Sequence, residues 1–173
     1  MIAAAPHPHE HVITPGVDAP QALRTALGCF ATGVTVITAT DDEGPFGITA
    51  NSFASVSLDP ALVLWSPAKS STRFARFTAV THYTIHVLGL EQGELSRRFT
   101  KGGAAFDGLD HHLNAEGAPV IPGTLARFEC RQWAVQDAGD HAIIIGQVLR
   151  AAHREGDPLG FARGQFGHFT PGS

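Results

Sequence analysis

One segment places hydroxyl groups and cations together at the start of a predicted helix. Residues 66–73 read Ser-Pro-Ala-Lys-Ser-Ser-Thr-Arg, and a short helix is predicted from Phe74. Ser70 and Ser71 are residue types that commonly cap a helix. The free N–H groups and the dipole at a helix start favour a phosphate, and Arg73 would add positive charge. The same residues also fit ordinary capping with surface charge, so both interpretations stay open.

A histidine at the beginning of a strand is the second candidate. Gly139 and Asp140 have the composition of a turn, and His141 opens the apolar strand that follows. The ring nitrogens of a histidine in this position can bind a ligand. The alternative is turn chemistry with a ring that faces solvent.

Familiar nucleotide and hydrolase motifs are absent from the sequence. It contains no GxxxxGK[ST], no GxGxxG after a strand, no GxSxG and no HExxH. His7, His9 and His11 lack a second ligand group of known spacing, so we expect a flexible tail there and no metal site. Cys29 and Cys130 lie far apart and are expected to be small buried residues without a disulfide.

Composition indicates one globular domain. The chain has 173 residues, of which 43% are hydrophobic and 16% charged, and its formal net charge is -4. This charge gives no general attraction to nucleic acid or anionic membranes. No signal peptide or membrane span is evident, so we expect a cytoplasmic protein. We divide the chain into a flexible tail at 1–18 and one domain at 19–170.

A helix is predicted near the start of this domain. Leu23, Ala26, Leu27 and Phe30 fall on one apolar face at helical spacing. Asp18 is the expected N-cap, and the glutamine three residues later resembles a capping box.

Strands dominate the rest of the predicted structure. Residues 34–40 are mostly β-branched, and 61–65 are a continuous apolar run that we expect to be buried on both faces. Residues 82–87 alternate, which predicts that His82 and His86 face outward together. About seven strands in total, with short helices between them, favour a β-barrel with helical additions.

Less regular structure is expected near the end of the chain. Residues 101–123 are rich in Gly, Asp and His and predict a long loop. Two long strands follow, and Phe161 begins a last short strand.

Several segments together resemble the flavin reductase-like family. Residues 30–38 (Phe-Ala-Thr-Gly-Val-Thr-Val-Ile-Thr), 47–53 (Gly-Ile-Thr-Ala-Asn-Ser-Phe) and 55–60 (Ser-Val-Ser-Leu-Asp-Pro) carry most of the likeness, and Gly-Asp-His at 139–141 continues it. The resemblance runs from about residue 22 to residue 169, in fixed order. The family supplies the reductase components of two-component flavin-dependent monooxygenases.

The resemblance implies a fold and a set of ligand-binding residues. It implies a mainly β, split β-barrel of the Greek-key, FMN-binding type with short helices, which binds FMN or FAD near the interface of a homodimer. The residues that it assigns to flavin are Gly47, Ile48, Thr49, Asn51, Ser52, Ser66, Pro67, Ala68, Ser71, Thr72, Arg73, Arg98 and Phe99. Those that it assigns to NADH are His141, Phe161, Ala162, Arg163 and Gly164.

The implied activity is hydride transfer from NADH, or NADPH, to the flavin. No side chain needs to act as an acid or base, because the protein stacks the two rings and stabilises the reduced flavin. Reduced flavin would then diffuse to a partner monooxygenase. The sequence departs from the family where many relatives have Tyr and this chain has Phe166, and where Ala162 replaces the second residue of a common aromatic pair.

Two other readings stay open. The same barrel can be a flavin-retaining module that serves as a sensor or an electron shuttle without NADH turnover. It can also be a dimeric structural partner without a cofactor. The choices between FMN and FAD, and between NADH and NADPH, are also left open.

Overall fold

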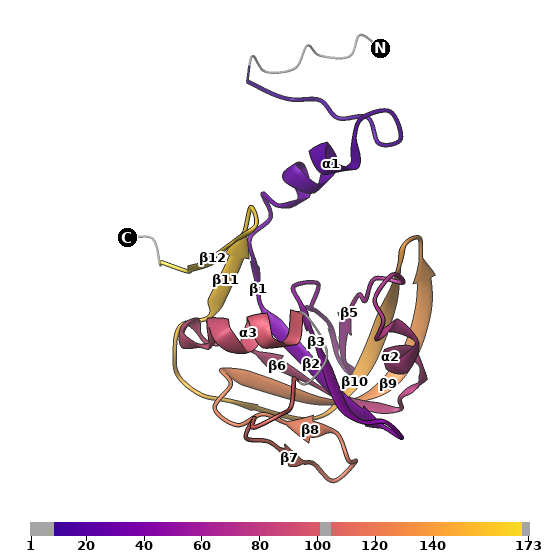
Figure 1. Ribbon diagram of the computed structural model, residues 1–173, viewed down its shortest axis with the longest axis vertical. Coiled ribbons are helices and arrows are strands. Elements are labelled where there is room, and N and C mark those ends of the chain that lie inside the picture. Colours follow the sequence, from indigo (N-terminus) through magenta and orange to yellow (C-terminus); the bar gives the residue numbers. More distant parts are fainter. Residues whose placement is uncertain (1–8, 101–104, 171–173) are drawn as a thin grey trace.

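The structure is mainly β, with a few short helices, as the sequence predicts (Figure 1). The computed structural model describes residues 9–100 and 105–170. The strands are β1 (Thr32–Gly33), β2 (Thr35–Asp41), β3 (Gly44–Ala50), β4 (Ala54–Leu58), β5 (Ala61–Trp65), β6 (His82–Val87), β7 (His112–Leu113), β8 (Pro119–Val120), β9 (Ala126–Ala138), β10 (His141–His153), β11 (Leu159–Ala162) and β12 (Gln165–His168). The helices are α1 (Pro20–Leu27), α2 (Phe74–Ala79) and α3 (Gly93–Thr100), with a 3-10 turn at Leu90–Gln92. None of the helices within the described ranges is long and apolar enough to cross a membrane.

One large antiparallel sheet organises the molecule. Its seven strands lie in the order β3-β2-β6-β9-β10-β5-β4. A three-stranded sheet, β1-β11-β12, and a two-stranded sheet, β7-β8, lie beside it. The predicted strands at 34–40 and 61–65 are confirmed as β2 and β5.

Curvature of the large sheet encloses one of two apolar clusters in the described part of the chain. Phe46 of β3 and Trp65 of β5 both pack on Phe77 of α2, with ring centroids 4.6 and 5.0 Å from it. Neither Trp65 nor Phe77 has exposed surface. Strands near opposite ends of the sheet therefore share one core, which α2 helps to close.

Strand β5 is only partly covered within the single chain. Val63 and Trp65 point into the core, whereas Leu62 and Leu64 alternate to the other face and are half buried. The sequence predicts that both faces of this strand are buried. Within a single chain, only the face that carries Val63 and Trp65 is buried.

His86 is fully buried, so the prediction that it faces outward with His82 is wrong. Its Nδ1 lies 3.1 Å from the carbonyl oxygen of Val36, and its Nε2 accepts a 3.0 Å hydrogen bond from the N–H of Ile121. Since Nε2 accepts a bond, the ring is neutral and carries its proton on Nδ1. The segment that holds β7 and β8 covers this face of β6, although the sequence predicts residues 101–123 to be a loop.

The first helix begins differently from the prediction. Pro20 is its first residue and Ala19 its N-cap, without a side-chain cap. The carboxylate of Asp18 instead accepts a 2.7 Å hydrogen bond from the N–H of Thr14. The fixed φ of proline suits the first helical position, so this helix starts without the predicted capping box.

The sheet β1-β11-β12 projects from the large sheet and leads into α1 (Figure 1). A two-residue turn at Arg163 and Gly164 joins β11 to β12, with φ of 50° and 79°. Positive φ at both residues is typical of a type I′ hairpin turn, whose twist matches the strands. The sequence predicts one short strand here, and the structure contains a hairpin.

Protonation of His86 should couple folding to pH. Burial lowers the pKa of His86 from its ordinary value of 6.5 to about 4. The unfolded chain takes up the proton below pH 6.5 and the folded chain only near pH 4, so stability that is present above pH 6.5 is lost as the pH falls between these values. We expect the free energy of unfolding, measured by urea titration, to fall by about 2 kcal/mol between roughly pH 7.5 and pH 5.

Two variants on the same strand separate this effect from other titrations. His86→Asn should flatten the pH dependence, whereas His82→Asn should leave it unchanged. An equally steep dependence in His86→Asn would show that other groups cause it.

Candidate functional site

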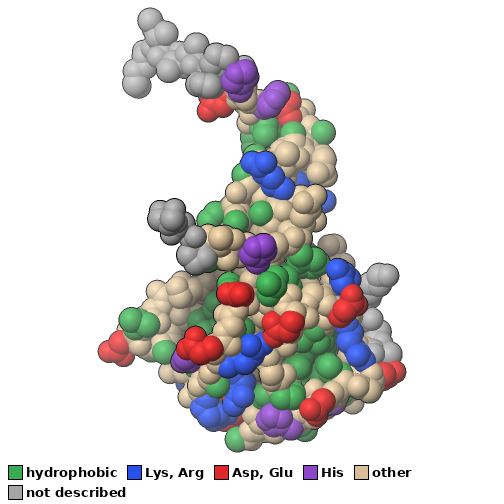
Figure 2. Space-filling model, turned by 90° about the vertical axis from the view of Figure 1, so that its left-hand side faces the viewer, with side chains coloured by type: hydrophobic (Ala, Val, Ile, Leu, Met, Phe, Trp, Pro, Cys, Tyr) green, Lys and Arg blue, Asp and Glu red, His purple; other side chains and the backbone are tan. Residues whose placement is uncertain are grey.

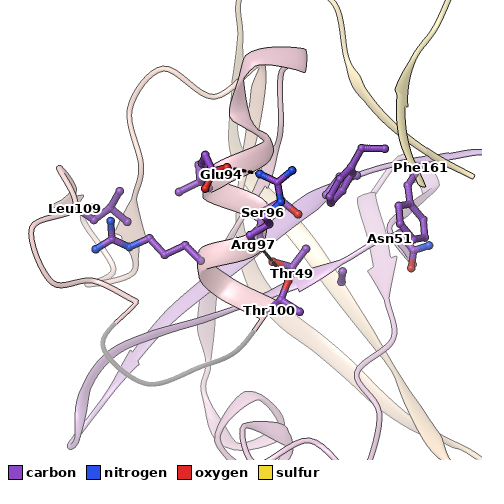
Figure 3. A pocket seen from close by; sticks show the side chains of 13 residues that line it. Thr49, Asn51, Glu94, Ser96, Arg97, Thr100, Leu109 and Phe161 are labelled. Carbon is purple, nitrogen blue, oxygen red and sulfur yellow. Dashed lines mark hydrogen bonds and ion pairs between the residues drawn. The ribbon is translucent and has the colours of Figure 1, made fainter. Parts of the chain in front are cut away.

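A pocket of about 1120 Å³ lies between the end of β3, helix α3 and the β11–β12 hairpin (Figure 3). It is lined by Val34, Thr49, Ala50, Asn51, Glu94, Leu95, Ser96, Arg97, Arg98, Thr100, Leu109, Phe161 and Phe166. Segments that are far apart in the sequence meet here, and the volume suits a large organic ligand.

Helix α3 lies close against β3, and this contact forms two walls of the pocket. The hydroxyl of Thr49 donates a 2.6 Å hydrogen bond to the carbonyl of Ser96. Phe99 is fully buried, and a Cβ at Gly47 would lie only 2.6 Å from its ring. A residue larger than glycine at position 47 would therefore push the helix away from the strand.

Arg73 links the same two elements through hydrogen bonds to their backbones. Its Nη1 donates to the carbonyls of Gly47 and Phe99 at 3.1 and 3.0 Å, and its Nη2 donates to the carbonyl of Thr100 at 3.3 Å. Phe99 and Thr100 end α3, where a cation also compensates the helix dipole. Burial lowers the pKa of Arg73 from its ordinary value, yet a guanidinium stays charged. The guanidinium predicted to bind phosphate is thus bound to backbone.

One buried hydroxyl at the pocket wall has no partner among the described residues. Ser96 is fully buried, and its Oγ makes no hydrogen bond in the structure. An unmade hydrogen bond in a buried site is costly. A ligand or an ordered water at this wall would relieve that cost.

Aromatic rings of the hairpin form the opposite wall. The rings of Phe161 and Phe166 meet edge to face at a centroid distance of 5.6 Å. The guanidinium of Arg97 lies 5.7 Å from the centre of the Phe166 ring, and Glu94 pairs with Arg97. In Figure 3, Phe161 lies on the same side of the pocket as Asn51.

The predicted phosphate segment lies outside this pocket. None of residues 66–73 lines it. The Ser52 hydroxyl accepts a 2.9 Å bond from the Ser66 N–H, so these two residues satisfy each other. Helix α2 has six residues and is capped by no side chain, which corrects the predicted serine cap. Ser71 instead accepts a bond from the N–H of Arg73 at 3.3 Å, and Thr72 is exposed.

Other residues of the predicted flavin set serve the packing. Ile48 points to the other side of β3 and packs on the apolar core. Arg98 lines the pocket, but its Nε donates to the carbonyl of Ala105 at 2.6 Å and its Nη2 to that of Asp107. Arg98 therefore holds the segment after α3 in place.

The structure brings only part of the predicted NADH set to the pocket. Phe161 lines it, Ala162 ends β11, and Arg163 and Gly164 form the hairpin turn. His141 does not line it. This residue begins β10, pairs with Ala68 in an isolated bridge, and places its Nδ1 2.7 Å from the Asp140 carboxylate, which lowers the pKa of Asp140.

Sequence reasoning missed most of the α3 wall. Glu94, Leu95, Ser96, Arg97 and Thr100 were not assigned to the site. The sequence contains one signal for them, which is a pair of small polar residues four positions apart on that helix. Such a pair, here Ser96 and Thr100, permits close approach to a strand, and the Ser96 carbonyl does accept a hydrogen bond from Thr49 of β3.

Neither cysteine lines this pocket, and His9 and His11 do not line it either. Cys130 is buried as predicted, whereas Cys29 is exposed, and both are free. His7 lies outside the described residues. Within residues 9–100 and 105–170, no three His, Cys, Asp or Glu side chains are placed to hold a metal.

Removal of the Arg73 side chain should destabilise the fold. Loss of a surface phosphate ligand would change folding little, but the contacts of Arg73 predict a loss of about 2 kcal/mol in the free energy of unfolding, because two backbone carbonyls lose a charged donor. Urea unfolding measures this loss, with Arg131→Ala as a control for an exposed arginine that bonds only to Gln147. An unchanged unfolding midpoint in Arg73→Ala would contradict the structural role.

Comparison with known proteins gives a consistent result. The chain is 62% identical, over 98% of both chains, to "FMN reductase (NADH) SmoA" of Agrobacterium fabrum. It is 45% identical to the "Flavin-dependent trigonelline monooxygenase, reductase component" of Acinetobacter baylyi, and spans only 48% of that longer protein. Among solved structures, the Streptomyces globisporus NADH:FAD oxidoreductase SgcE6, "in complex with NAD and FAD fragments", superposes with a TM-score of 0.86 at 36% identity, over 94% of this chain and 98% of that one. A sequence profile described as "Flavin reductase like domain" matches residues 27–170, and the chain belongs to this family.

Proposed function

We propose that this protein is an NADH-dependent flavin reductase that supplies reduced flavin to a separate monooxygenase. The observation that carries the proposal is a large pocket lined by both polar groups and aromatic rings. The relative with 62% identity acts on FMN and NADH by its name, and another relative is the reductase component of a monooxygenase. We therefore favour FMN over FAD.

The residues present fit a flavin in this pocket. An isoalloxazine needs flat apolar contacts on its faces and hydrogen-bonding groups at its edge. Val34, Ala50 and Leu95 offer apolar contacts, and the exposed amide of Asn51 offers both a donor and an acceptor. The unpartnered hydroxyl of Ser96 is a further polar group on this wall.

The chain's own residues would bind and orient the two substrates. A bound flavin supplies the acceptor for a hydride from the reduced nicotinamide ring. Phe161 and Phe166 would exclude water on the nicotinamide side, and the Glu94–Arg97 pair would fix the charge at the edge of the Phe166 ring. Because no proton needs to be moved by a side chain, we assign no catalytic acid or base.

The remaining predicted contacts belong to the ends of the ligands. We propose that Ser71 and Thr72, which lie away from the pocket, meet the phosphate end of the flavin. Arg163 is exposed at the hairpin turn, so it would supply positive charge on the proposed nicotinamide side of the pocket.

Absorbance spectroscopy tests the proposed activity. NADH should be oxidised only when FMN is added, and reduced flavin should accumulate without oxygen. Parallel assays with FAD and NADPH define the preference. Tight flavin retention without NADH oxidation would contradict the proposal and favour a sensor or an electron shuttle.

Two single substitutions test the assignment of the walls. Asn51→Ala should raise the KM for flavin several-fold and leave the KM for NADH unchanged, because a neutral hydrogen bond contributes about 0.5–1.5 kcal/mol. We propose that His141 meets the nicotinamide nucleotide from outside the pocket of its own chain, so His141→Ala should raise the KM for NADH alone. Gln136→Ala, which removes an exposed amide on β9, is the control. Loss of turnover at saturating substrates in His141→Ala would give His141 a role in the chemical step, and unchanged constants would remove it from the site.

We also propose that the curved sheet is a split β-barrel that works as a homodimer. Leu64 and Ile145 are cross-strand neighbours on the outer face of β5 and β10, and both are only half buried, as are Leu62 and Ile143. An apolar strip of this kind suits an interface with a second copy of the chain. Light scattering at micromolar concentration should give about twice 18.3 kDa, and a monomer with full activity would contradict the dimer.

A further inference from the structure

The segment from Val12 to Phe30, here named the N-terminal arm, extends away from the rest of the molecule (Figure 1). No residue of its helix α1 is buried. Figure 2 shows the arm rising from the body of the protein with hydrophobic side chains along it. An isolated helix of eight residues is marginally stable in water, so this helix requires a packing partner.

The apolar face of the arm is the part that lacks cover. Leu27 is 65% exposed and Phe30 78%, and Val12 and Val17 are more than two-thirds exposed. Leu23 and Leu27 lie one turn apart on one face of α1, where a surface helix normally packs on a core, and Phe30 follows the end of the helix. From Ala19 to Phe30 the only charged residue is an arginine, so the arm lacks the basic face that would direct it to an anionic membrane.

The base of the arm is joined to the pocket wall. The N–H of Arg163 donates a 2.7 Å hydrogen bond to the carbonyl of Gly28, and a Cβ at Gly28 would lie 3.5 Å from the Arg163 Cα. Arg163 is in the turn between β11 and β12, whose strands carry Phe161 and Phe166. A packing contact that holds the arm in place therefore also restricts the movement of Phe161 and Phe166.

We propose that the arm packs its apolar face on the outer face of β5 and β10 in a second copy of this chain, and thereby holds the β11–β12 hairpin of its own pocket. The occupant is a second copy because Leu62, Leu64 and Ile145 form an apolar strip that is only partly covered within one chain, and the arm has an apolar face without cover. This inference rests on the homodimer proposed above.

The apolar surface of the arms is large enough for a stable contact between two copies of the chain. With about 150–250 Å² for a phenylalanine side chain, the exposed apolar residues of one arm offer on the order of 500 Å². Two arms and the surfaces that receive them give roughly 2,000 Å² in a symmetric dimer. Stable interfaces bury about 1,200–2,000 Å², so the arms alone account for a stable contact.

Matched charge substitutions test the arm. The variant Leu27→Asp with Phe30→Asp places two carboxylates on the apolar face, and Gln21→Asp with Thr25→Asp places two on the opposite face. Sedimentation should show at least a tenfold weaker dimer in the first variant and an unchanged dimer in the second. Since α1 has no buried residue in its own chain, neither variant should unfold the large sheet.

Hydrogen exchange and kinetics complete the test. The amides of α1 should be protected in the native dimer and exchange freely in Leu27→Asp/Phe30→Asp. The KM for NADH should rise several-fold in that variant alone, because the hairpin is released. Three results would overturn the packing of the arm on the second copy: a monomeric native protein, an equally tight dimer in this variant, or unprotected α1 amides in the dimer. An unchanged KM would overturn the link between the arm and the pocket.

Failure of the proposed activity would be recognised separately. A native dimer with protected α1 amides but no NADH oxidation would refute the reductase activity and leave the packing of the arm on the second copy unaffected. Hydrogen exchange of the β11–β12 hairpin would then test the link between the arm and the pocket.

Discussion

The close contact between Gly47 and the ring of Phe99 determines where α3 lies, and the pocket depends on that position. A missing side chain on β3 allows the helix to approach until Thr49 bonds to the Ser96 carbonyl. The Arg73 guanidinium then holds the end of the helix to the strand through backbone carbonyls. Steric space, a hydrogen bond and a partly buried charge thus act on one pair of elements. A change in any of them alters the width of the site.

Hydrogen bonds from buried side chains to backbone position the other layers as well. Thr38 donates to the Pro119 carbonyl at 2.6 Å, and His86 bridges Val36 and Ile121. These bonds attach the β7–β8 segment to the outer face of β2 and β6. Because these side chains bond to backbone groups of the β7–β8 segment, the position of that segment depends on its backbone more than on its own side chains.

The sequence predicts local features better than long-range cover. The β-branched run at 34–40 and the apolar run at 61–65 became strands, since their pattern reflects local backbone preference. Alternation in 82–87 gave the two faces of β6 but could not tell that residues near 120 would bury His86. This information lies in contacts between distant parts of the chain, which no window of residues contains.

The same distinction applies to the site. Thr49 and Asn51 were found because their segment resembles a known family, and the structure puts both on the pocket. Arg73 was interpreted from its charge and its place before a helix, which describe a phosphate ligand as well as they describe a buried donor. Only the tertiary contacts with α3 distinguish these roles. Ser96 was missed because its helix pattern says nothing about which strand it meets.

The two proposed substrate sides of the pocket differ in how they are supported. The side formed by β3 and α3 is fixed by buried contacts within one chain, so it is preorganised for its ligand. The opposite side stands on a hairpin that projects from the large sheet, and β12 is exposed along its whole length. A rigid wall favours selective binding of one ring, whereas a wall on a projecting hairpin can adjust as a second ring stacks on it. The geometry of flavin binding therefore follows from contacts within one chain. The geometry of nicotinamide binding depends on what supports the hairpin from outside that chain.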